Sequence, residues 1–367
     1  MQYDIAAIIW PSYTGDEPRT RIFWEEGYGE WQSVKAMTNK GYEGCRWPRK
    51  PLWGYVNEAD PDVMEMQIRA AVRHKVNVFI YDWYWYDNRP FLENCLNDGF
   101  LGAPNNTDMQ FYLMWANHDA TYLWDKRNSY DQSCPVWLGK VTPKIFDEIC
   151  DRTIEKYFKQ PNYYKIDGCP VYMVFNIDNL VCTFDSLEDC RRGLERFREK
   201  VKAAGFPGLH LQMAVFGNGK HRYFADSEPM TERETIEYLG FDSFTNYNWA
   251  CCMDIDADYS VVIDRFREKC AEYSTWNLPY YPNITVGWDN NVRFNQFVKG
   301  VIRDNTPEKF ADACRNTKDY VDAGLQSGKL HAPLITVNSW NEWTETSYLE
   351  PDDLYGYGYL EKIKEIF

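Results

Sequence analysis

The sequence predicts one (β/α)8 barrel over residues 1–367, with a long aromatic-rich loop after its first strand. Eight short apolar segments, typical of parallel strands covered on both faces, alternate with amphipathic helical segments. Neither an internal repeat nor a low-complexity linker divides the chain. Five of the strand segments end in Trp or Tyr together with Asp, Asn, His or Glu, as expected where strand ends meet at one mouth. A doubly wound open sheet is the alternative, but it would gather ligand groups from fewer strand ends.

The chain is expected to begin with a strand at residues 3–9. Residues 10–57 follow as a loop that is too long for a plain connection, so we expect it to cover or line a site, with a purely structural lid as the alternative. The aromatic residues of this loop include Tyr13, Trp24, Tyr28, Trp31, Trp47 and Trp53. A helix then begins at Asp60-Pro61, where a side-chain acceptor precedes a proline in the first turn, and ends near His74.

The other elements follow the same alternation. Further strands are predicted at residues 76–84, 110–115, 170–176, 209–215, 242–247, 283–286 and 334–338. Helices are predicted to begin at Thr142, Leu187, Thr231, Val261, Thr306 and Gly358. The segment Thr231-Glu-Arg-Glu234 has the form of a capping box.

Composition narrows the range of partners. A net charge of −15 argues against nucleic acid and anionic membranes, which bind through basic patches. No apolar run approaches the ~20 residues of a membrane span, and the N-terminus looks like a strand instead of a leader. The chain as printed is expected to be cytoplasmic, or periplasmic or secreted if a leader was removed.

Cysteine and histidine usage predicts no metal site. The eleven Cys are scattered through predicted strands and helices, which indicates mostly free thiols and a reducing compartment. Cys251-Cys252 has no second Cys pair or His at ligand spacing. We therefore expect neither a metal nor another cofactor.

The segment most informative about function is 334–351, in which a buried strand runs directly into acids and indoles. Glu342, Glu345 and Glu350 follow it, and no Lys or Arg is near them in the sequence to neutralise them. They are interleaved with Trp340, Trp343 and Tyr348. One Glu alone is commonly a cap or a loop ion pair, but a pair among three indoles at a strand end favours a functional role.

Aromatic faces with Asn, Asp and Glu between them are suited to carbohydrate, because indoles stack on sugar rings and the hydroxyls need paired donors and acceptors. The expected partner is an oligosaccharide or polysaccharide. Candidate substrate-binding residues are Tyr13, Asp82, Trp83, Trp115, Asn117, His118, Trp288, Asp289, Arg293, Trp340, Asn341, Trp343 and Glu350. For each one separately, packing or a supporting hydrogen bond is the alternative. Arg293 is expected to hold Asp289 or Glu350, or to recognise an acidic sugar.

Glu342 and Glu345 are the predicted catalytic pair. On a continuing strand these positions would point to opposite faces, so the chain must turn after Asn338 for both to face the mouth. Two neighbouring carboxylates cannot both ionise easily, and one then keeps its proton. An acid beside a base is the minimum requirement for cleaving a glycosidic bond.

The segment Ser-Trp-Asn-Glu-Trp-Thr-Glu-Thr-Ser-Tyr-Leu-Glu-Pro at 339–351 resembles the signature of glycoside hydrolase family 99, which contains endo-acting α-mannosidases and mannanases. It is still more similar to the WbsX-type domains of polysaccharide gene clusters. Further segments resemble that group in the same order, so the resemblance covers nearly the whole chain. They include Gly-Tyr-Gly-Glu-Trp at 27–31, Tyr-Asp-Trp-Tyr-Trp at 81–85, Gly-Trp-Asp-Asn at 287–290 and Tyr-Gly-Tyr-Gly-Tyr at 355–359.

The resemblance implies a metal-free barrel that cleaves α-linked glycans with retention of configuration. By analogy with family 99, Glu342 would act as base on the sugar's own 2-hydroxyl, and Glu345 as acid and then base. One departure is that the family usually has His-Glu-Gly where this chain has Thr344-Glu345-Thr346. The missing imidazole weakens the analogy for substrate contacts but leaves the carboxylate pair intact.

Two other functions compete. WbsX-type domains have been labelled glycosyltransferases, and Asp254-Ile-Asp256 and Asp256-Ala-Asp258 match the bare Asp-x-Asp pattern that holds a metal and diphosphate in some of those enzymes. Such triplets are frequent in acidic proteins, and these lie beside a predicted helix start, where a carboxylate has an ordinary capping role. The third reading is a non-catalytic glycan-binding barrel, although such a protein has no reason to keep the acid pair.

Overall fold

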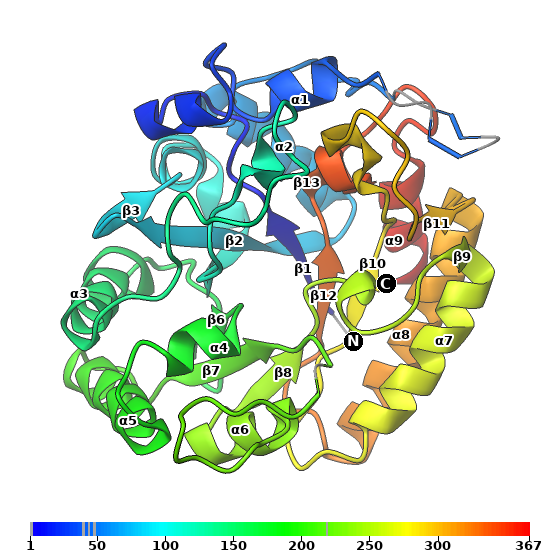
Figure 1. The fold of residues 1–367 in the computed structure, drawn as a ribbon. Coiled ribbons are helices and arrows are strands. Elements are labelled where there is room, and N and C mark those ends of the chain that lie inside the picture. The colour runs from blue at the N-terminus through cyan, green and yellow to red at the C-terminus, as the bar shows by residue number, and fades with distance from the viewer. Residues whose placement is uncertain (1–2, 39–40, 43–44, 47–48, 218) are drawn as a thin grey trace.

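Strand β1 (Asp4–Ile9) lies inside a parallel sheet that curves into a barrel (Figure 1). The structure is a computed structural model that describes residues 3–38, 41–42, 45–46, 49–217 and 219–367. The order of barrel strands is β10-β12-β1-β2-β4-β6-β7-β8. The other bounds are β2 Val76–Tyr86, β4 Gln110–Trp115, β6 Cys169–Val174, β7 His210–Ala214, β8 Ser243–Thr245, β10 Asn283–Thr285 and β12 Leu334–Asn338. All eight predicted strands are present.

The barrel is nearly closed. Strand β8 meets the segment before β10 in a single parallel bridge between Phe244 and Tyr280. Two backbone hydrogen bonds cross this seam, from Phe244 N to Pro279 O at 3.0 Å and from Tyr281 N to Phe244 O at 2.9 Å. The predicted (β/α)8 class is therefore confirmed, with one weakly joined seam.

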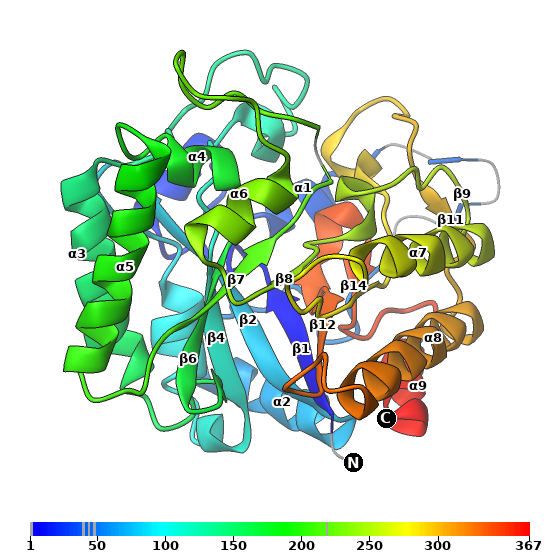
Figure 2. The same ribbon diagram turned by 90° about the horizontal axis from the view of Figure 1, so that it is seen from below.

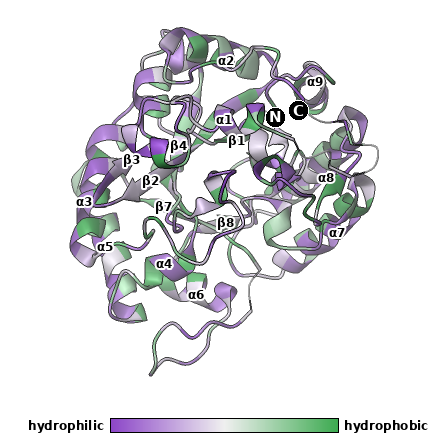
Figure 3. Ribbon diagram, turned by 45° about the horizontal axis from the view of Figure 1, so that its top comes forward, coloured by the Kyte–Doolittle hydropathy of each residue, from purple (hydrophilic) through white to green (hydrophobic). Residues whose placement is uncertain are grey.

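Helices surround the strands. Their bounds are α1 Trp31–Lys35, α2 Pro61–Arg73, α3 Pro143–Thr153, α4 Ile177–Val181, α5 Leu187–Ala203, α6 Glu232–Leu239, α7 Tyr259–Tyr273, α8 Pro307–Gln326 and α9 Gly358–Ile366. In Figure 3 the long outer helices carry both hydrophobic and hydrophilic residues. In α5 the buried face includes Cys190, Leu194, Phe197 and Val201, so period-3.6 patterning located the helices that pack on the sheet. The capping box of α6 is confirmed at Thr231 and Glu234.

The connection between β2 and β4 contains elements that were not predicted. Strand β2 is longer than expected and pairs with β3 (Arg89–Phe91) in an antiparallel hairpin. Its two-residue loop, Asp87 and Asn88, has positive φ at both positions, which suits a tight hairpin turn. A π-helix, η2 (Cys95–Phe100), then takes the place of the α-helix of an ideal barrel unit.

The smaller elements lie mainly in the connections. Short helical turns are η1 Pro18–Ile22, η3 Asn106–Asp108, η4 Tyr122–Trp124, η5 Ile154–Phe158, η6 Trp249–Cys251, η7 Asn290–Arg293 and η8 Trp343–Glu345. Short strands are β5 Lys165–Ile166, β9 Ala257–Asp258, β11 Ile302–Arg303, β13 Asn341–Glu342 and β14 Ser347–Tyr348. Figure 2 shows long connecting loops at the end of the barrel opposite the N-terminus.

The aromatic loop after β1 forms a second small core above the barrel. Trp24 and Trp31 are buried there, packed with aromatic residues from β2 and from the 116–137 region. The Trp31 Nε1 donates to Val56 O at 2.8 Å, which ties the middle of the loop to its C-terminal end. Trp47 lies outside the described residues. The loop therefore acts mostly as a packed cover, and one residue at its start reaches the site described below.

None of the described helices is long and apolar enough to cross a lipid bilayer. All eleven cysteines are free thiols, as the scattered spacing predicted.

Candidate active site

The chain turns sharply where β12 ends. The Asn338-Ser339 peptide bond is cis, and the chain then forms a hairpin in which β13 pairs with β14. Two serine hydroxyls fasten this hairpin: Ser339 Oγ donates to Ser347 O at 2.6 Å, and Ser347 Oγ donates to Asn338 O at 2.7 Å. The bend that the sequence argument required is present.

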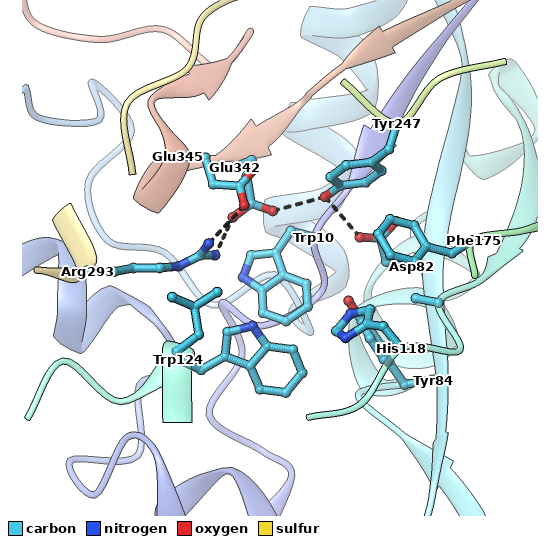
Figure 4. A pocket seen from close by; sticks show the side chains of 12 residues that line it. Trp10, Asp82, Tyr84, His118, Trp124, Phe175, Tyr247, Arg293, Glu342 and Glu345 are labelled. Carbon is cyan, nitrogen blue, oxygen red and sulfur yellow. Dashed lines mark hydrogen bonds and ion pairs between the residues drawn. The ribbon is translucent and has the colours of Figure 1, made fainter. Parts of the chain in front are cut away.

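The bend brings Glu342 and Glu345 to one cavity at the mouth of the barrel (Figure 4). The cavity has a volume of about 240 Å³. Its walls come from the ends of several strands and from the loops above them, which is where this architecture builds its sites. The lining residues are Trp10, Asp82, Tyr84, Ala116, His118, Leu123, Trp124, Phe175, Tyr247, Arg293, Glu342 and Glu345.

Arg293 bridges the two glutamates. Its guanidinium donates to Glu345 Oε1 at 2.8 Å and to Glu342 Oε1 at 3.0 Å, and it donates to Glu30 Oε1 at 3.2 Å. All four side chains are at least nine-tenths buried. The expectation that Arg293 holds Asp289 or Glu350 was wrong, because folding brings a cation to acids that have none near them in the sequence. Glu30 lies in the Gly-Tyr-Gly-Glu-Trp segment at 27–31 that resembles the family, but no role was predicted for it.

The site contains more carboxyls than cations. Burial and repulsion from Glu345 raise the pKa of Glu342 well above its usual value, and burial raises the pKa of Glu345, while Arg293 opposes both shifts. Burial and Glu345 also raise the pKa of Asp82 well above its usual value. Two close carboxyls beside one guanidinium then favour a single shared proton on the glutamate pair.

Tyr247 lies between the two sides of the cavity. Its hydroxyl is 3.4 Å from Asp82 Oδ2 and 3.5 Å from Glu342 Oε2 (Figure 4). The other oxygens, Asp82 Oδ1 and Glu345 Oε2, are buried and have no hydrogen-bond partner among the described residues. Both oxygens belong to residues that line the cavity, where the hydroxyl groups of a bound ligand would supply the missing donors.

The aromatic walls of the cavity differ from the sequence prediction. They are formed by Trp10, Tyr84, Trp124, Phe175 and Tyr247. Trp10 directly follows β1, and Phe175 follows β6, so the strand-end rule could have found both. Trp124 belongs to the short helix η4 in a loop, and no periodicity signal marks its direction.

Three of the predicted substrate-binding residues line the cavity: Asp82, His118 and Arg293. The other ten do not: Tyr13, Trp83, Trp115, Asn117, Trp288, Asp289, Trp340, Asn341, Trp343 and Glu350. Most of these are structural. Trp83 donates from Nε1 to Glu93 Oε1 at 2.9 Å, and Trp115 packs against Phe146 in the core.

The indoles of the motif itself point away from the cavity. Trp343 stacks on Tyr348 with ring centroids 3.8 Å apart, and Trp340 packs on Phe79. Asn117 joins strand ends through hydrogen bonds to the backbone of Asn176. The strand-end rule therefore located the mouth but not which aromatic rings face it.

Within the described ranges, no group of three or more His, Cys, Asp and Glu side chains is arranged to hold a metal ion. His118 contributes instead as a neutral donor and acceptor. Its Nδ1 lies 2.9 Å from Asp119 O, and burial lowers the pKa of the ring. The Nδ1–H tautomer that this carbonyl favours leaves Nε2 as an acceptor.

The barrel has the (β/α)8 fold that is also found in solved glycoside hydrolases. The structure of the GH99 endo-alpha-mannosidase from Bacteroides thetaiotaomicron superposes with a TM-score of 0.55 at 15% identity, covering 98% of this chain and 95% of that one. A protein described as "Glycoside hydrolase-like protein" superposes with a TM-score of 0.57 at 14% identity, covering 100% and 94%. At these identities the likeness shows the fold alone.

The chain belongs to the family described as Glycosyltransferase WbsX, whose model matches residues 6–363. It is 24% identical over 362 residues to the uncharacterized protein WxcX of Xanthomonas campestris pv. campestris, an alignment that covers 95% of this chain and 47% of WxcX. The chain thus spans about half the length of the curated relatives it matches. The resemblance seen in the sequence is confirmed for both family and fold.

Proposed function

We propose that this protein is a glycoside hydrolase that cleaves an α-linked glycan with retention of configuration. The observation that carries the proposal is the pair Glu342 and Glu345, which project from one turn into one cavity and share the guanidinium of Arg293. A pair of carboxyls holding one proton supplies an acid beside a base.

The two glutamates are assigned different roles. Glu342 has Oε1 fixed by Arg293 and by the Thr344 hydroxyl at 3.2 Å, which orients it as the base. Because the pKa of Glu342 is strongly raised, the shared proton must first lie on Glu345 for Glu342 to act in this role. Glu345 has Oε1 on Arg293 and leaves the buried Oε2 unpartnered among the described residues. That free oxygen is suited to carry the proton that a leaving group needs.

The proposed reaction has two steps. Glu342 takes the proton of the 2-hydroxyl as that oxygen bonds to C1, while the bond from C1 to the leaving oxygen breaks and that oxygen takes a proton from Glu345. Water then attacks C1 as Glu345 takes its proton, the C1–O2 bond breaks, and Glu342 returns its proton to O2. Two inversions at C1 give net retention.

The remaining walls are assigned to sugar binding. Trp10 and Trp124 offer apolar ring faces, and their centroids lie 5.1 Å apart. Asp82 and His118 offer hydrogen-bonding atoms on the other side of the cavity. This combination of aromatic faces and a few polar groups is typical of small-molecule and sugar pockets.

Sugar transfer from a nucleotide sugar is the second candidate, because the family description names a glycosyltransferase. The acidic triplets offer it little support. Asp256 is paired with Arg303 and Asp258 with Lys309, and Asp258 caps α7 by accepting from Ser260 N at 2.9 Å. None of these acids lines the cavity.

The test is Glu345→Gln. This substitution should lower turnover of a cleaved glycan by about 10²–10⁴-fold and leave glycan affinity nearly unchanged, because the aromatic walls remain. Polysaccharide digestion, a glycan-binding assay and NMR of the released anomer measure the three quantities. Hydrolysis at the wild-type rate by this variant would overturn the assignment of the acid.

A matched control separates hydrolysis from metal-dependent transfer. Asp256→Asn removes one acid of the triplets at a distance from the cavity and should leave hydrolysis unchanged. Loss of activity in this variant, together with a requirement for magnesium and a nucleotide sugar, would favour the transferase instead.

A further inference from the structure

A second pair of buried carboxyls lies beneath the site. Glu58 precedes α2, and Glu350 follows β14, and these side chains are 0% and 2% exposed. The Gln67 amide nitrogen donates to both, at 3.1 Å to Glu58 Oε1 and at 2.8 Å to Glu350 Oε1. Neither carboxyl forms an ion pair with a Lys, Arg or His of the described chain. Two uncompensated buried anions so close together would be costly, so at least one of them carries a proton.

This pair holds both neighbours of Glu342 in the sequence. Asn341 Nδ2 donates to Glu58 Oε2 at 2.8 Å, and Trp343 Nε1 donates to Glu350 Oε2 at 2.6 Å. The backbone on either side of Glu342 is therefore anchored to one carboxyl each.

The same pair fixes a wall of the cavity. The side-chain amide of Asn341 accepts from Trp10 N at 2.8 Å and donates to Trp10 O at 2.9 Å. Trp10 lines the cavity, and its Nε1 donates to Glu30 Oε2 at 2.5 Å. Glu30 in turn holds Arg293, so a chain of hydrogen bonds runs from the buried pair to the cation of the site.

We propose that Glu58 and Glu350 are positioning residues that share a proton, and that this proton-linked pair sets the place of Glu342 and of Trp10. The proposal deepens the proposed function and rests on it for the effect on turnover. Neither residue reaches the cavity, so the pair acts only through Asn341 and Trp343.

The surroundings of the pair agree with a shared proton. The titratable groups that face it are Cys95, from η2, with Sγ 3.9 Å from Glu58 Oε2, and Tyr81, from β2, and Tyr13, from the first loop, both influenced by Glu58. Burial raises the pKa of these groups, so they are neutral near pH 7. Burial also raises the pKa of Glu58 to about 7 and that of Glu350 well above its usual value, where repulsion from Glu58 adds to it.

The decisive comparison is between Glu350→Gln and Glu350→Ala. In Glu350→Gln the amide nitrogen donates to Glu58 as the protonated acid does and the oxygen still accepts from Trp343, so that only the hydrogen bond from Gln67 Nε2 is lost, whereas alanine removes all three contacts. We expect Glu350→Gln to keep kcat at pH 7.5 within about threefold of the wild type. We expect Glu350→Ala to lower kcat by about 30-fold or more, with KM changed by less than threefold.

A readout independent of hydrolysis keeps this test separate from the proposed function. Tryptophan emission of the wild type, followed from pH 5 to 9, should change as the pair gains or loses a proton next to Trp343. The change should be strongly reduced in Glu350→Gln, where the group bonded to Trp343 no longer titrates, and should persist in Glu345→Gln. Emission that titrates alike in the wild type and Glu350→Gln, or a glutamine variant as impaired as the alanine variant, would overturn the proposal. If no glycan is hydrolysed, the pH dependence of the tryptophan emission still tests whether Glu58 and Glu350 share a proton.

Discussion

Asp82 is a single residue whose chemistry is changed by its position in the fold. It is 4% exposed, and the hydrogen bond that its side chain accepts from the Tyr247 hydroxyl is long at 3.4 Å. Burial and Glu345 raise the pKa of Asp82 well above its usual value, so the carboxyl keeps its proton to a higher pH than a free aspartate does. A neutral carboxylic acid both donates and accepts, which matches the needs of a sugar hydroxyl.

Asp82→Asn tests that charge state. The native protein keeps a proton on Asp82 that the unfolded chain loses near pH 3.8, so this group makes the wild type less stable as pH rises through the interval up to the folded-state pKa. The asparagine variant lacks this loss. The free energy of unfolding of the variant minus that of the wild type should therefore increase by about 1.4 kcal/mol for each pH unit within that interval. Urea unfolding between pH 4 and 8 measures this difference.

A pH-independent difference between Asp82→Asn and the wild type would show that Asp82 is ionised in the folded protein. Glu234→Gln is the comparison of opposite sign: the capping box lowers the pKa of this surface carboxyl, so the wild type should gain stability over this variant as pH rises.

The turn η8 is the element on which the site depends. It ends at Thr346, whose φ of 52° lies in the left-handed region. That conformation is costly for a β-branched residue, and the related family usually has glycine at this position. The Thr346 hydroxyl donates to Asp289 O at 2.7 Å, which compensates for part of the strain and ties the turn to the loop after β10.

Thr346→Val and Thr346→Gly separate strain from hydrogen bonding. Valine keeps the branched side chain and loses the donor, so it should lower the free energy of unfolding by about 1–3 kcal/mol. Glycine loses the donor but relieves the backbone strain, so its cost should be smaller. Denaturant unfolding of the two variants gives the order, and a glycine variant less stable than the valine variant would contradict this account.

The element scale also shows what the sequence could predict. Caps and apolar periodicity located the strands and the principal helices, because burial against a sheet imposes those patterns. Local pattern also placed Glu342 and Glu345 at the mouth. Local pattern could not show that Arg293 and Glu30 would contact the two glutamates. Nor could it show that Trp10, and not Trp343, would line the cavity. Both outcomes depend on contacts between segments that lie far apart in the chain.

At the scale of the whole molecule, the barrel is held unevenly. Strand β1 pairs along its length with both β2 and β12, whereas β8 meets the segment before β10 at the Phe244–Tyr280 bridge. Local opening is easiest where few backbone hydrogen bonds must break. The seam between β8 and β10 is therefore the place where the wall should open first.

Hydrogen exchange followed by mass spectrometry tests this expectation. Amides of β8 (Ser243–Thr245) and β10 (Asn283–Thr285) should exchange at least tenfold faster than those of β1 (Asp4–Ile9), although all three strands are buried. Equal protection around the barrel would mean that side-chain packing, and not the number of backbone hydrogen bonds, governs opening.

Both motif glutamates hang from the same short turn, three residues apart. When the seam opens during thermal motion, the two carboxyls move together because one turn carries both. The distance between them is therefore preserved. A site whose two acids came from opposite sides of the seam would lose its spacing each time. The protein can therefore tolerate opening of the barrel at this seam, since Glu342 and Glu345 both lie on one side of it.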